Sequence, residues 1–385
     1  MIKIPHQRSG ILNNYRFTIV LGSLFVLLMC TGNDQIILKF DSKMVKIQKK
    51  YVPDLSLEVF RMKLINENDQ WILNGETTRP EVKNLVASVA DSILGANTYL
   101  NKLKVLPDSS LRDSIYGIVR ISVANLRDEP RERAQLIDQN IMGQILHLLK
   151  KEKGWYLVWT EYHYLGWCTE ESFIRTDSAG AAQWQSEATA RVNQLFPLVY
   201  SQPAESSEPV SDVVLNARLK IESQKDGWSK VILPDNRAGF IRAKFLSPES
   251  FPQKSPEALR KDIIATARSM MGLPYLWGGN SSKGNDCSGF THIVFKTNGI
   301  QLPRDSRQQA LLGQEIIADE SFSNILPGDL FFFGSTERVS HVGISLGGAD
   351  YIDQSGMVQI SSLDSTAKNF SPYRKKTLKT IRRVF

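Results

Sequence analysis

The chain has 385 residues, of which 42% are hydrophobic and 23% are charged, and its formal net charge is +7 at pH 7. This length predicts several domains, and the composition is that of a globular protein rather than a disordered or fibrous one. Basic residues are spread along the chain. The densest run, which begins at Arg374, alternates with apolar residues as in the solvated face of a strand, so nothing supports nucleic-acid binding.

Residues 1–30 are typical of an export signal. Basic residues precede an apolar stretch of thirteen residues, Phe17 to Met29, which is too short to span a bilayer comfortably. Cys30 follows, as in a lipoprotein signal whose cysteine becomes the lipidated first residue. Met29 is not the small residue usual before such a cysteine, so ordinary cleavage or an uncleaved anchor stays open. We predict an exported protein of the cell envelope or periplasm that is tethered to a membrane through lipid at Cys30.

Residues 31–115 have the pattern of a small α+β unit. Alternating residues predict strands at Leu55–Leu64 and Gln70–Gly75, and a third strand is expected at Tyr99–Leu106. Pro80–Leu94 has helical spacing, with proline in the first turn. The pattern assigns no function to this unit.

An internal repeat follows this unit. Gly154-Trp is followed twelve residues later by Gly166-Trp, and Gly227-Trp is followed at the same spacing by Gly239-Phe. Short strands, turn residues and one aromatic residue per hairpin predict two small SH3-like β-barrels, the first of which occupies residues 116–175.

The second barrel and the segment that connects it to the first occupy residues 176–255. The connecting segment has helical spacing from Trp184 to Leu195. Beyond Cys30 the chain has only Cys168 and Cys287, and a bond between them would disable the nucleophile proposed below. We therefore interpret Cys168 as a buried core thiol and expect no disulfide.

Residues 256–385 carry the pattern that indicates chemistry. A glycine-rich segment leads to Asp286 at a helix N-cap position, and Cys287 opens an apolar-periodic helix. A thiol at a helix N-terminus lies at the positive end of the helix dipole, which favours the nucleophilic thiolate. A further helix is expected at Pro256–Met271. Four strands are expected after these helices: Asp329–Phe333, His341–Leu346, Tyr351–Gln354 and Val358–Ser361.

A proton acceptor for the thiol is found by elimination among five histidines. Three lie in the leader or in the first barrel. His292 follows Cys287 by five residues on the same helix and faces away from it. His341, which opens a predicted strand, remains as the base. A helix that carries the nucleophile, packed on an antiparallel sheet that carries the base, is an α+β arrangement.

These residues resemble a known family, the NlpC-type cysteine peptidases, which are papain-like endopeptidases that cut the peptide stems of bacterial peptidoglycan. The resemblance covers residues 258–385. It rests on five motifs: Pro274-Tyr-Leu-Trp-Gly-Gly, Asp286-Cys-Ser-Gly-Phe, Leu302-Pro-Arg-Asp-Ser-Arg-Gln, Leu326-Pro-Gly-Asp-Leu-Phe-Phe-Phe and His341-Val-Gly-Ile. With its barrels, the chain is similar to the subgroup of γ-D-glutamyl–L-diamino acid endopeptidases that act on stem peptides with a free N-terminal L-alanine. The implied fold is an α+β papain-like cysteine peptidase domain preceded by two small SH3-like β-barrels and a small N-terminal α+β unit.

The requirements of amide cleavage, together with the resemblance, assign the catalytic roles. Cys287 attacks the carbonyl carbon, and His341 takes the thiol proton, or holds it in an ion pair, and gives it to the leaving amine. The family's third residue is polar, often histidine; here Asp353 aligns with it, and a carboxylate can orient the imidazole. The resemblance puts the hydroxyl of Tyr275 beside the thiol, where it and the Cys287 backbone N–H would stabilise the oxyanion.

The resemblance also implies residues that bind the substrate. Glu129 and Tyr164 of the first barrel match the carboxylate and the aromatic ring that meet the free amine. Asp286, Ser288 and Ser306 match residues that line the near side of the peptide. No metal or organic cofactor is expected, because no His/Cys/Asp cluster has ligand spacing.

The leading hypothesis is a cell-envelope cysteine endopeptidase that acts on peptidoglycan stem peptides during turnover or recycling. The sequence also fits two other classes. One is a cell-wall-binding protein with SH3-type modules and a weak or idle catalytic domain, an option that Asp353 in the third position leaves open. The other is a papain-like amidase or acyltransferase, because papain-like sites serve several acyl transfers.

Overall fold

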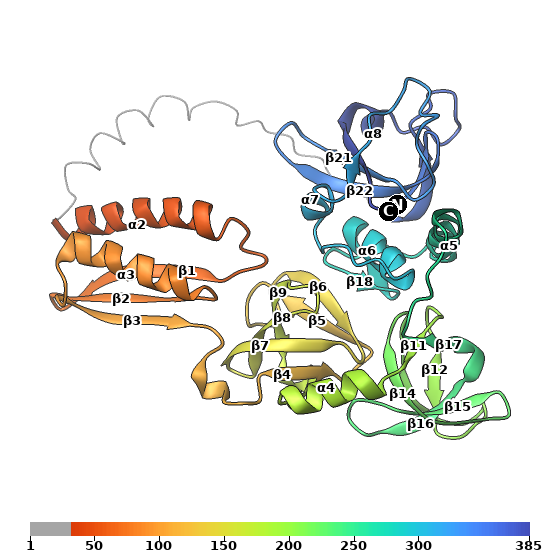
Figure 1. Ribbon diagram of the computed structural model, residues 1–385, viewed down its shortest axis with the longest axis horizontal. Coiled ribbons are helices and arrows are strands. Elements are labelled where there is room, and N and C mark those ends of the chain that lie inside the picture. Colours follow the sequence, from red (N-terminus) through yellow and green to blue (C-terminus); the bar gives the residue numbers. More distant parts are fainter. Residues whose placement is uncertain (1–31) are drawn as a thin grey trace, which may run out of the picture. The chain divides into compact units, whose positions relative to one another are not determined.

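The computed structural model describes residues 32–385 (Figure 1), so the predicted export signal and Cys30 lie outside the described residues. Contacts divide the chain into two compact units, one that extends to Leu106 and one that spans Pro107–Phe385. Within the described residues, no helix combines the length and the apolar character needed to cross a membrane.

The first unit is a three-stranded sheet whose apolar core is shared with two helices. Its elements are α2 (Gly32–Tyr51), β1 (Phe60–Glu67), β2 (Gln70–Thr77), α3 (Pro80–Leu94) and β3 (Tyr99–Val105). β1 pairs antiparallel with β2, and β3 pairs parallel with β2 after the α3 crossover. Leu64, Leu73 and Leu103 of the three strands belong to one core with residues of both helices.

The predicted helix at Pro80–Leu94 is confirmed, but the first strand begins at Phe60 rather than at Leu55. The carboxylate of Asp54 accepts hydrogen bonds from the backbone N–H and the hydroxyl of Ser56, at 3.0 and 2.7 Å. These local bonds form a turn that competes with extended backbone. The alternating residues before Phe60 therefore do not form a strand.

Two antiparallel sheets of seven strands open the second unit. The first contains β4 (Tyr116–Val119), β5 (Val123–Arg127), β6 (Leu136–Ile141), β7 (Ile145–Glu152), β8 (Trp155–Trp159), β9 (Leu165–Thr169) and β10 (Phe173–Thr176). The second contains β11 (Ala190–Val192), β12 (Leu198–Tyr200), β13 (Pro209–Asp212), β14 (Arg218–Lys225), β15 (Trp228–Ile232), β16 (Ala238–Arg242) and β17 (Leu246–Pro248). Short 3-10 helices lie at Ser109–Leu111, Glu170–Ser172 and Ala243–Phe245.

The two sheets repeat one topology. Their strand orders are β10-β4-β7-β8-β9-β5-β6 and β17-β11-β14-β15-β16-β12-β13, so every strand of one has a counterpart in the other. Lys153-Gly154 and Asp226-Gly227 form the equivalent hairpin turns, with positive φ at both positions, as the right-handed twist of a two-residue hairpin requires. The buried Trp155 and Trp228 follow these turns. The Gly-Trp repeat thus marks equivalent hairpins.

A helix joins the two sheets, although the predicted position was wrong. α4 spans Ser178–Glu187 and is capped by Asp177, whose carboxylate accepts a hydrogen bond from the Gly180 backbone N–H at 2.8 Å. The predicted helix would have continued through Ala190–Val192. These residues instead pair with strands on both sides as β11, because sheet pairing overrides local helical spacing.

The rest of the chain contains a separate two-stranded sheet, formed by β18 and β19, and a six-stranded antiparallel sheet with helix α6 packed against it (Figure 1). The strand order of the larger sheet is β20-β25-β21-β22-β23-β24. The helices are α5 (Pro256–Ser269), α6 (Cys287–Thr297), α7 (Ser306–Gln309) and α8 (Pro372–Thr377). The strands are β18 (Asn280–Ser281), β19 (Gly284–Asn285), β20 (Gln314–Glu315), β21 (Leu330–Gly334), β22 (Val339–Gly347), β23 (Asp350–Ser355), β24 (Met357–Ser362) and β25 (Leu378–Arg383). The predicted α+β class and the four predicted strands are confirmed.

Apolar side chains cover both faces of this sheet. Leu330 and Phe332 of β21 belong to the core that contains α5 and α6, whereas Phe331 and Phe333 belong to a second core with Tyr351. A strand buried on both faces needs a continuous apolar run rather than alternation. This explains why the run Leu-Phe-Phe-Phe of β21 contains no polar residue.

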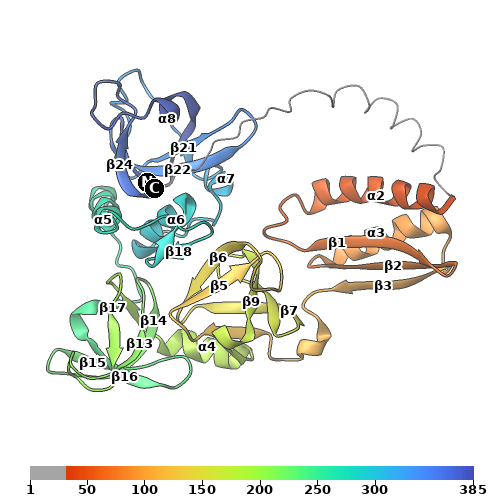
Figure 2. The ribbon, with the colours of Figure 1, turned by 180° about the vertical axis from the view of Figure 1, so that it is seen from behind.

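Strand β6 of the first sheet lies against the segment that leads into α6 (Figure 2). Gly278 has φ +72°, and a Cβ at this position would lie 2.3 Å from the backbone oxygen of Leu136, so only glycine permits the approach. The backbone N–H of Asn280 and the hydroxyl of Ser281 both donate to Gln139 Oε1, at 3.0 and 2.9 Å. The first sheet is therefore fixed directly beside the start of α6.

Candidate active site

Cys287 is the first residue of helix α6, as predicted. The carboxylate of Asp286 caps the helix by accepting a hydrogen bond from the Gly289 backbone N–H at 2.8 Å. A Cβ at Gly289 would lie 2.1 Å from the backbone oxygen of Gly279. Glycine at this position therefore lets the approach segment cross closely over the first helical turn. Cys287 itself is only 8% exposed.

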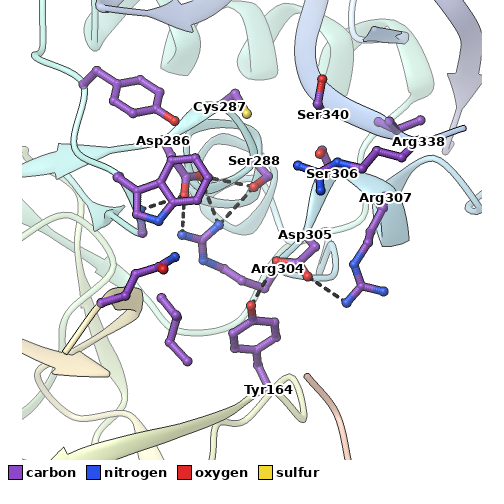
Figure 3. A pocket seen from close by; sticks show the side chains of 16 residues that line it. Tyr164, Asp286, Cys287, Ser288, Arg304, Asp305, Ser306, Arg307, Arg338 and Ser340 are labelled. Carbon is purple, nitrogen blue, oxygen red and sulfur yellow. Dashed lines mark hydrogen bonds and ion pairs between the residues drawn. The ribbon is translucent and has the colours of Figure 1, made fainter. Parts of the chain in front are cut away.

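A pocket of about 270 Å³ opens beside Cys287 (Figure 3). Six of the predicted catalytic or substrate-binding residues line it: Tyr164, Tyr275, Asp286, Cys287, Ser288 and Ser306. The first sheet contributes Tyr164 together with Gln135 and Ile137. The pocket is thus built jointly by the first sheet and by the part of the chain that contains α6.

His341 and Asp353 lie on the neighbouring strands β22 and β23 and form a close pair. His341 Nε2 is 2.6 Å from Asp353 Oδ2, and the two residues are 6% and 1% exposed. The backbone of Val342 hydrogen-bonds the Cys287 thiol, so the strand that carries His341 runs beside this thiol. Because Nε2 faces the carboxylate, Nδ1 is the ring nitrogen left for the thiol.

Burial determines the charge state of this constellation. It raises the pKa of the Cys287 thiol to about 12, and the charge of Asp286 adds to the shift, while the backbone hydrogen bond from Val342 opposes it. Burial likewise lowers the pKa of His341, although the bond to Asp353 opposes that shift. Both directions favour a neutral thiol beside a neutral imidazole, despite the helix dipole. Two roles were predicted for His341: accepting the thiol proton during the attack, or holding it beforehand in an ion pair. The neutral resting pair favours the first.

Tyr275 reaches the same pocket from the segment before α6. Its pKa is raised, first by burial and then by the negative charges that Cys287 and Asp286 can carry. The phenol therefore keeps its proton at neutral pH and remains a hydrogen-bond donor.

Arg304 is a lining residue of the pocket and forms a buried ionic network there (Figure 3). It contacts both oxygens of Asp286, at 3.0 and 2.7 Å, and donates to Ser288 Oγ at 3.0 Å. Its Nε donates to Asp138 Oδ1 of the first sheet at 2.7 Å. Although burial lowers the pKa of Arg304, the carboxylates of Asp286 and Asp138 raise it well above its ordinary value. Arg304 therefore holds two predicted substrate-binding residues and joins them to the first sheet.

Asp305 is a pocket residue that the sequence analysis missed. Tyr164 donates its hydroxyl proton to Asp305 Oδ1 at 3.0 Å (Figure 3), and Arg307 pairs with the other oxygen at 2.9 Å. The pKa of Tyr164 is raised by burial and by the charge of Asp305. The available signal was the position of Asp305 directly before the predicted Ser306, since a neighbour of a predicted pocket residue can line the same pocket.

The structure does not bring Glu129 to the residues that line this pocket. Its carboxylate is 55% exposed and forms an ion pair with Arg131 at 2.7 Å. His292, which was set aside as a base, is buried and packs on the ring of Tyr162 with ring centroids 4.6 Å apart.

Both cysteines within residues 32–385 are free thiols, and Cys168 is fully buried. Burial raises the pKa of Cys168 to about 12, so this thiol remains protonated at neutral pH. No three His, Cys, Asp or Glu side chains of the described chain are grouped so that they could hold a metal ion.

Comparison with known proteins gives consistent matches. The NlpC/P60 family matches residues 272–381. Dipeptidyl-peptidase 6 of Lysinibacillus sphaericus is 30% identical over 257 residues, which cover 64% of this chain and 92% of that protein. The γ-D-glutamyl-L-lysine dipeptidyl-peptidase of Bacillus cereus is 29% identical over 229 residues, which cover 57% of this chain and 67% of that protein. A crystal structure of an NlpC/P60 family protein from Bacillus cereus aligns with a TM-score of 0.60 at 24% identity and covers 70% of this chain and 99% of that one. This last likeness shows a shared fold.

Proposed function

The chain belongs to the NlpC/P60 family of cysteine peptidases, and from this premise we propose that it is a cell-envelope endopeptidase for peptidoglycan stem peptides. The bond cleaved is the γ-D-glutamyl–L-diamino acid amide, in peptides with a free N-terminal L-alanine. The observation that carries the proposal is Cys287 at the start of α6, in a pocket beside the paired His341 and Asp353. The names of the relatives, which include γ-D-glutamyl-L-lysine dipeptidyl-peptidase, support this substrate class.

The mechanism follows from the neutral resting pair. Cys287 Sγ attacks the γ-carbonyl carbon of the D-glutamyl residue while His341 Nδ1 accepts the thiol proton. Asp353 stabilises the imidazolium that forms. The oxyanion accepts hydrogen bonds from the Cys287 backbone N–H and the Tyr275 hydroxyl. His341 then protonates the leaving amine. In the second half of the reaction, water attacks the thioester while His341 accepts a proton from it, and His341 then returns this proton to the Cys287 sulfur.

Selection of a free amine is assigned to the side of the pocket that the first sheet lines. An ammonium group that loses water needs a carboxylate partner, and an unpaired charge there costs several kcal/mol. Asp305 supplies a carboxylate within the pocket, and Tyr164 fixes its orientation. Glu129 lies near Gln135 in the chain but does not line the pocket and is paired with Arg131, so its predicted contact with the amine needs a movement of its loop.

We also propose that the two repeated sheets are SH3-type modules, with the first in residues 116–175 and the second within 176–255. Their shared strand order and equivalent hairpins support this assignment. A cell-wall-binding protein with an idle catalytic domain is the weaker candidate, because the nucleophile, base and carboxylate are all present in the buried site.

Attachment to a membrane face through lipid at Cys30 completes the proposal. Helix α2 starts at Gly32, and four of its exposed lysines follow one flank at helical spacing: Lys39, Lys43, Lys46 and Lys50. Each lysine near an anionic lipid surface contributes about 1 kcal/mol of attraction. Such a flank would hold the first unit close to the membrane. Detergent-phase partitioning that is lost in Cys30→Ser supports lipidation, and partitioning that persists indicates an uncleaved anchor.

The central experiment compares L-Ala-γ-D-Glu-diaminopimelate with the same peptide acetylated at its amine. Mass spectrometry should show L-Ala-D-Glu released from the first peptide only, and no release by Cys287→Ala. Failure of the wild-type protein to cleave either peptide would refute the proposed activity. Equal cleavage of both would instead refute selection for the free amine.

Matched variants then locate the amine site. Asp305→Asn should raise KM for the free peptide about ten-fold, in keeping with the loss of one charged hydrogen bond, and should leave the acetylated peptide a poor substrate. Glu129→Gln should have the same effect only if the loop of Glu129 moves to the substrate. An effect of Glu129→Gln without one of Asp305→Asn would exclude Asp305 as the partner of the amine.

A further inference from the structure

A line of hydrogen bonds continues behind Asp353, away from the nucleophile. Ser355 Oγ is 2.6 Å from Asp353 Oδ2, the same oxygen that His341 Nε2 approaches. Arg374, from helix α8, donates through Nη2 to Ser355 Oγ at 3.2 Å. Four side chains from three elements are therefore connected in the order Arg374, Ser355, Asp353 and His341.

Arg374 fixes the direction of every proton in this line. A guanidinium only donates hydrogen bonds, so Ser355 must accept from Arg374 and direct its own hydrogen elsewhere. Its near neighbour is Asp353 Oδ2, which can only accept while the carboxylate is ionised. The bond from the imidazole to this oxygen then requires a hydrogen on Nε2. Nδ1 is left with the lone pair that receives the thiol proton.

Arg374 also supplies a permanent positive charge to a buried carboxylate. Asp353 is 1% exposed, and its Oδ1 has no hydrogen-bond partner among the described residues. A buried carboxylate with so few donors is costly unless a cation lies nearby. His341 is neutral in the resting site, so it cannot be this cation. The guanidinium of Arg374 is held in place by the rings of Phe333 and Tyr373, at 5.4 and 5.6 Å from their centroids.

We propose that Arg374, acting through Ser355, is a positioning residue that orients Asp353 and keeps His341 in the tautomer with Nδ1 free. The proposal rests on the proposed peptidase function. It also explains how a carboxylate can occupy the third catalytic position without drawing a proton onto the imidazole in the resting enzyme. Arg374 touches neither substrate nor reacting atoms.

Removal of Arg374 has a predictable effect on pH dependence. The charged groups that face His341 are Asp353 from β23, Asp286 from the start of α6 and Arg374 from α8. Asp286 is already paired with Arg304 at 2.7 Å. Arg374 opposes protonation of the imidazole, so without it the pKa of His341 rises. Because the base must be neutral, the acid limb of kcat/KM then moves to higher pH.

The kinetic test uses Arg374→Gln, Ser355→Ala and the double variant, with Lys376→Gln as the control. Lys376 lies on the same helix and is exposed, so its replacement removes the same charge without touching the line. We expect Arg374→Gln to lower kcat about ten-fold with KM nearly unchanged, and Lys376→Gln to have no effect. The double variant should be no worse than the poorer single variant, because both break one connected unit. Additive losses, or an equal loss in Lys376→Gln, would overturn the proposal.

A measurement without substrate separates this proposal from the proposed function. In the Cys287→Ala protein, nitrogen NMR of His341 reports both its tautomer and its pKa. We expect hydrogen on Nε2, and a higher pKa when Arg374→Gln is added, but not when Lys376→Gln is added. An unchanged titration would refute the role of Arg374 even if the peptidase activity is confirmed. A raised pKa in a protein that cleaves no stem peptide would support Arg374 and refute the substrate assignment.

Discussion

The two repeated sheets share one strand order, yet only the first contributes side chains to the pocket. Equivalent positions in the two sheets also make different contacts. Where the first sheet has Asp138 on β6, the second has Ser211 on β13, whose hydroxyl bonds only to the backbone of the next residue. Where the first has Tyr164 before β9, the second has Arg237 before β16, which pairs with Asp235. In the first sheet these positions contact the part of the chain that contains α6, through Arg304 and Asp305.

The second sheet holds the other end of the same helix. Asn216 Nδ2 donates to Thr297 Oγ1 at 2.9 Å, and Arg191 Nη1 donates to the backbone oxygen of Thr297 at 3.2 Å. Helix α6 is thereby fixed near Cys287 by the first copy and at its last residue by the second. The first sheet therefore lines the pocket, whereas the second supports the far end of the helix that carries Cys287.

The largest expected effect contrasts the two free cysteines of the described chain. Cys287→Ala should lower kcat by at least about 10⁴-fold, since removal of a nucleophile removes the covalent pathway. Cys168→Ala, in the core of the first sheet, should leave kcat within a few-fold of wild type. Muropeptide cleavage measured by mass spectrometry, with circular dichroism as the check on folding, tests both. Substantial activity in Cys287→Ala would contradict the assignment of the nucleophile.

A smaller loss is expected at Asp353. Asp353→Ala should lower kcat by roughly ten- to a thousand-fold, because it removes the group that orients His341 but leaves the nucleophile in place. Steady-state kinetics on the free tripeptide measure this loss. Asp350→Ala, on the same strand but exposed, is the matched control. An unchanged kcat in Asp353→Ala would remove this residue from the catalytic group.

Stability should separate the equivalent positions of the two sheets. Asp138→Ala breaks the buried pair with Arg304, where the two side chains are 0% and 2% exposed, and such a loss costs about 3 kcal/mol. Ser211→Ala removes only a local hydrogen bond and should cost less than about 0.5 kcal/mol. Urea unfolding measures the difference. Similar costs at both positions would show that the first sheet is not held through Arg304.

The pH profile tests whether burial governs the site. A folded pKa of His341 below its ordinary value means that the imidazole stays neutral until the pH falls below about 6.5. Activity needs the neutral base, so the acid limb of kcat/KM should lie below pH 6.5 and be lost as pH falls through the lowered pKa. An acid limb near pH 8 would indicate instead that thiol ionisation limits the reaction.

The sequence predicted the local chemistry better than the contacts between distant segments. Cys287, its Asp286 cap and the strand of His341 follow from spacing, because each depends on a helix start or a strand pattern. Asp305 and Arg374 could not be identified from spacing as residues of the site. The roles proposed for them depend on contacts with Tyr164 and Ser355, which lie 141 and 19 residues away in the sequence. The shift of α4 has the same origin, since β11 forms only when its partner strands are present.

The smallest expected effect on kinetics is at Tyr164, whose counterpart in the second sheet is Arg237. Tyr164→Phe removes one hydroxyl and its 3.0 Å bond to Asp305, which is worth about 1 kcal/mol. We therefore expect KM for the free-amine peptide to rise about five-fold, with kcat unchanged, because Asp305 remains in the pocket but loses its orientation. Arg237→Gln, at the equivalent position of the second sheet, should leave KM unchanged. A five-fold effect on the acetylated peptide as well would mean that Tyr164 shapes the pocket generally and does not act through the amine.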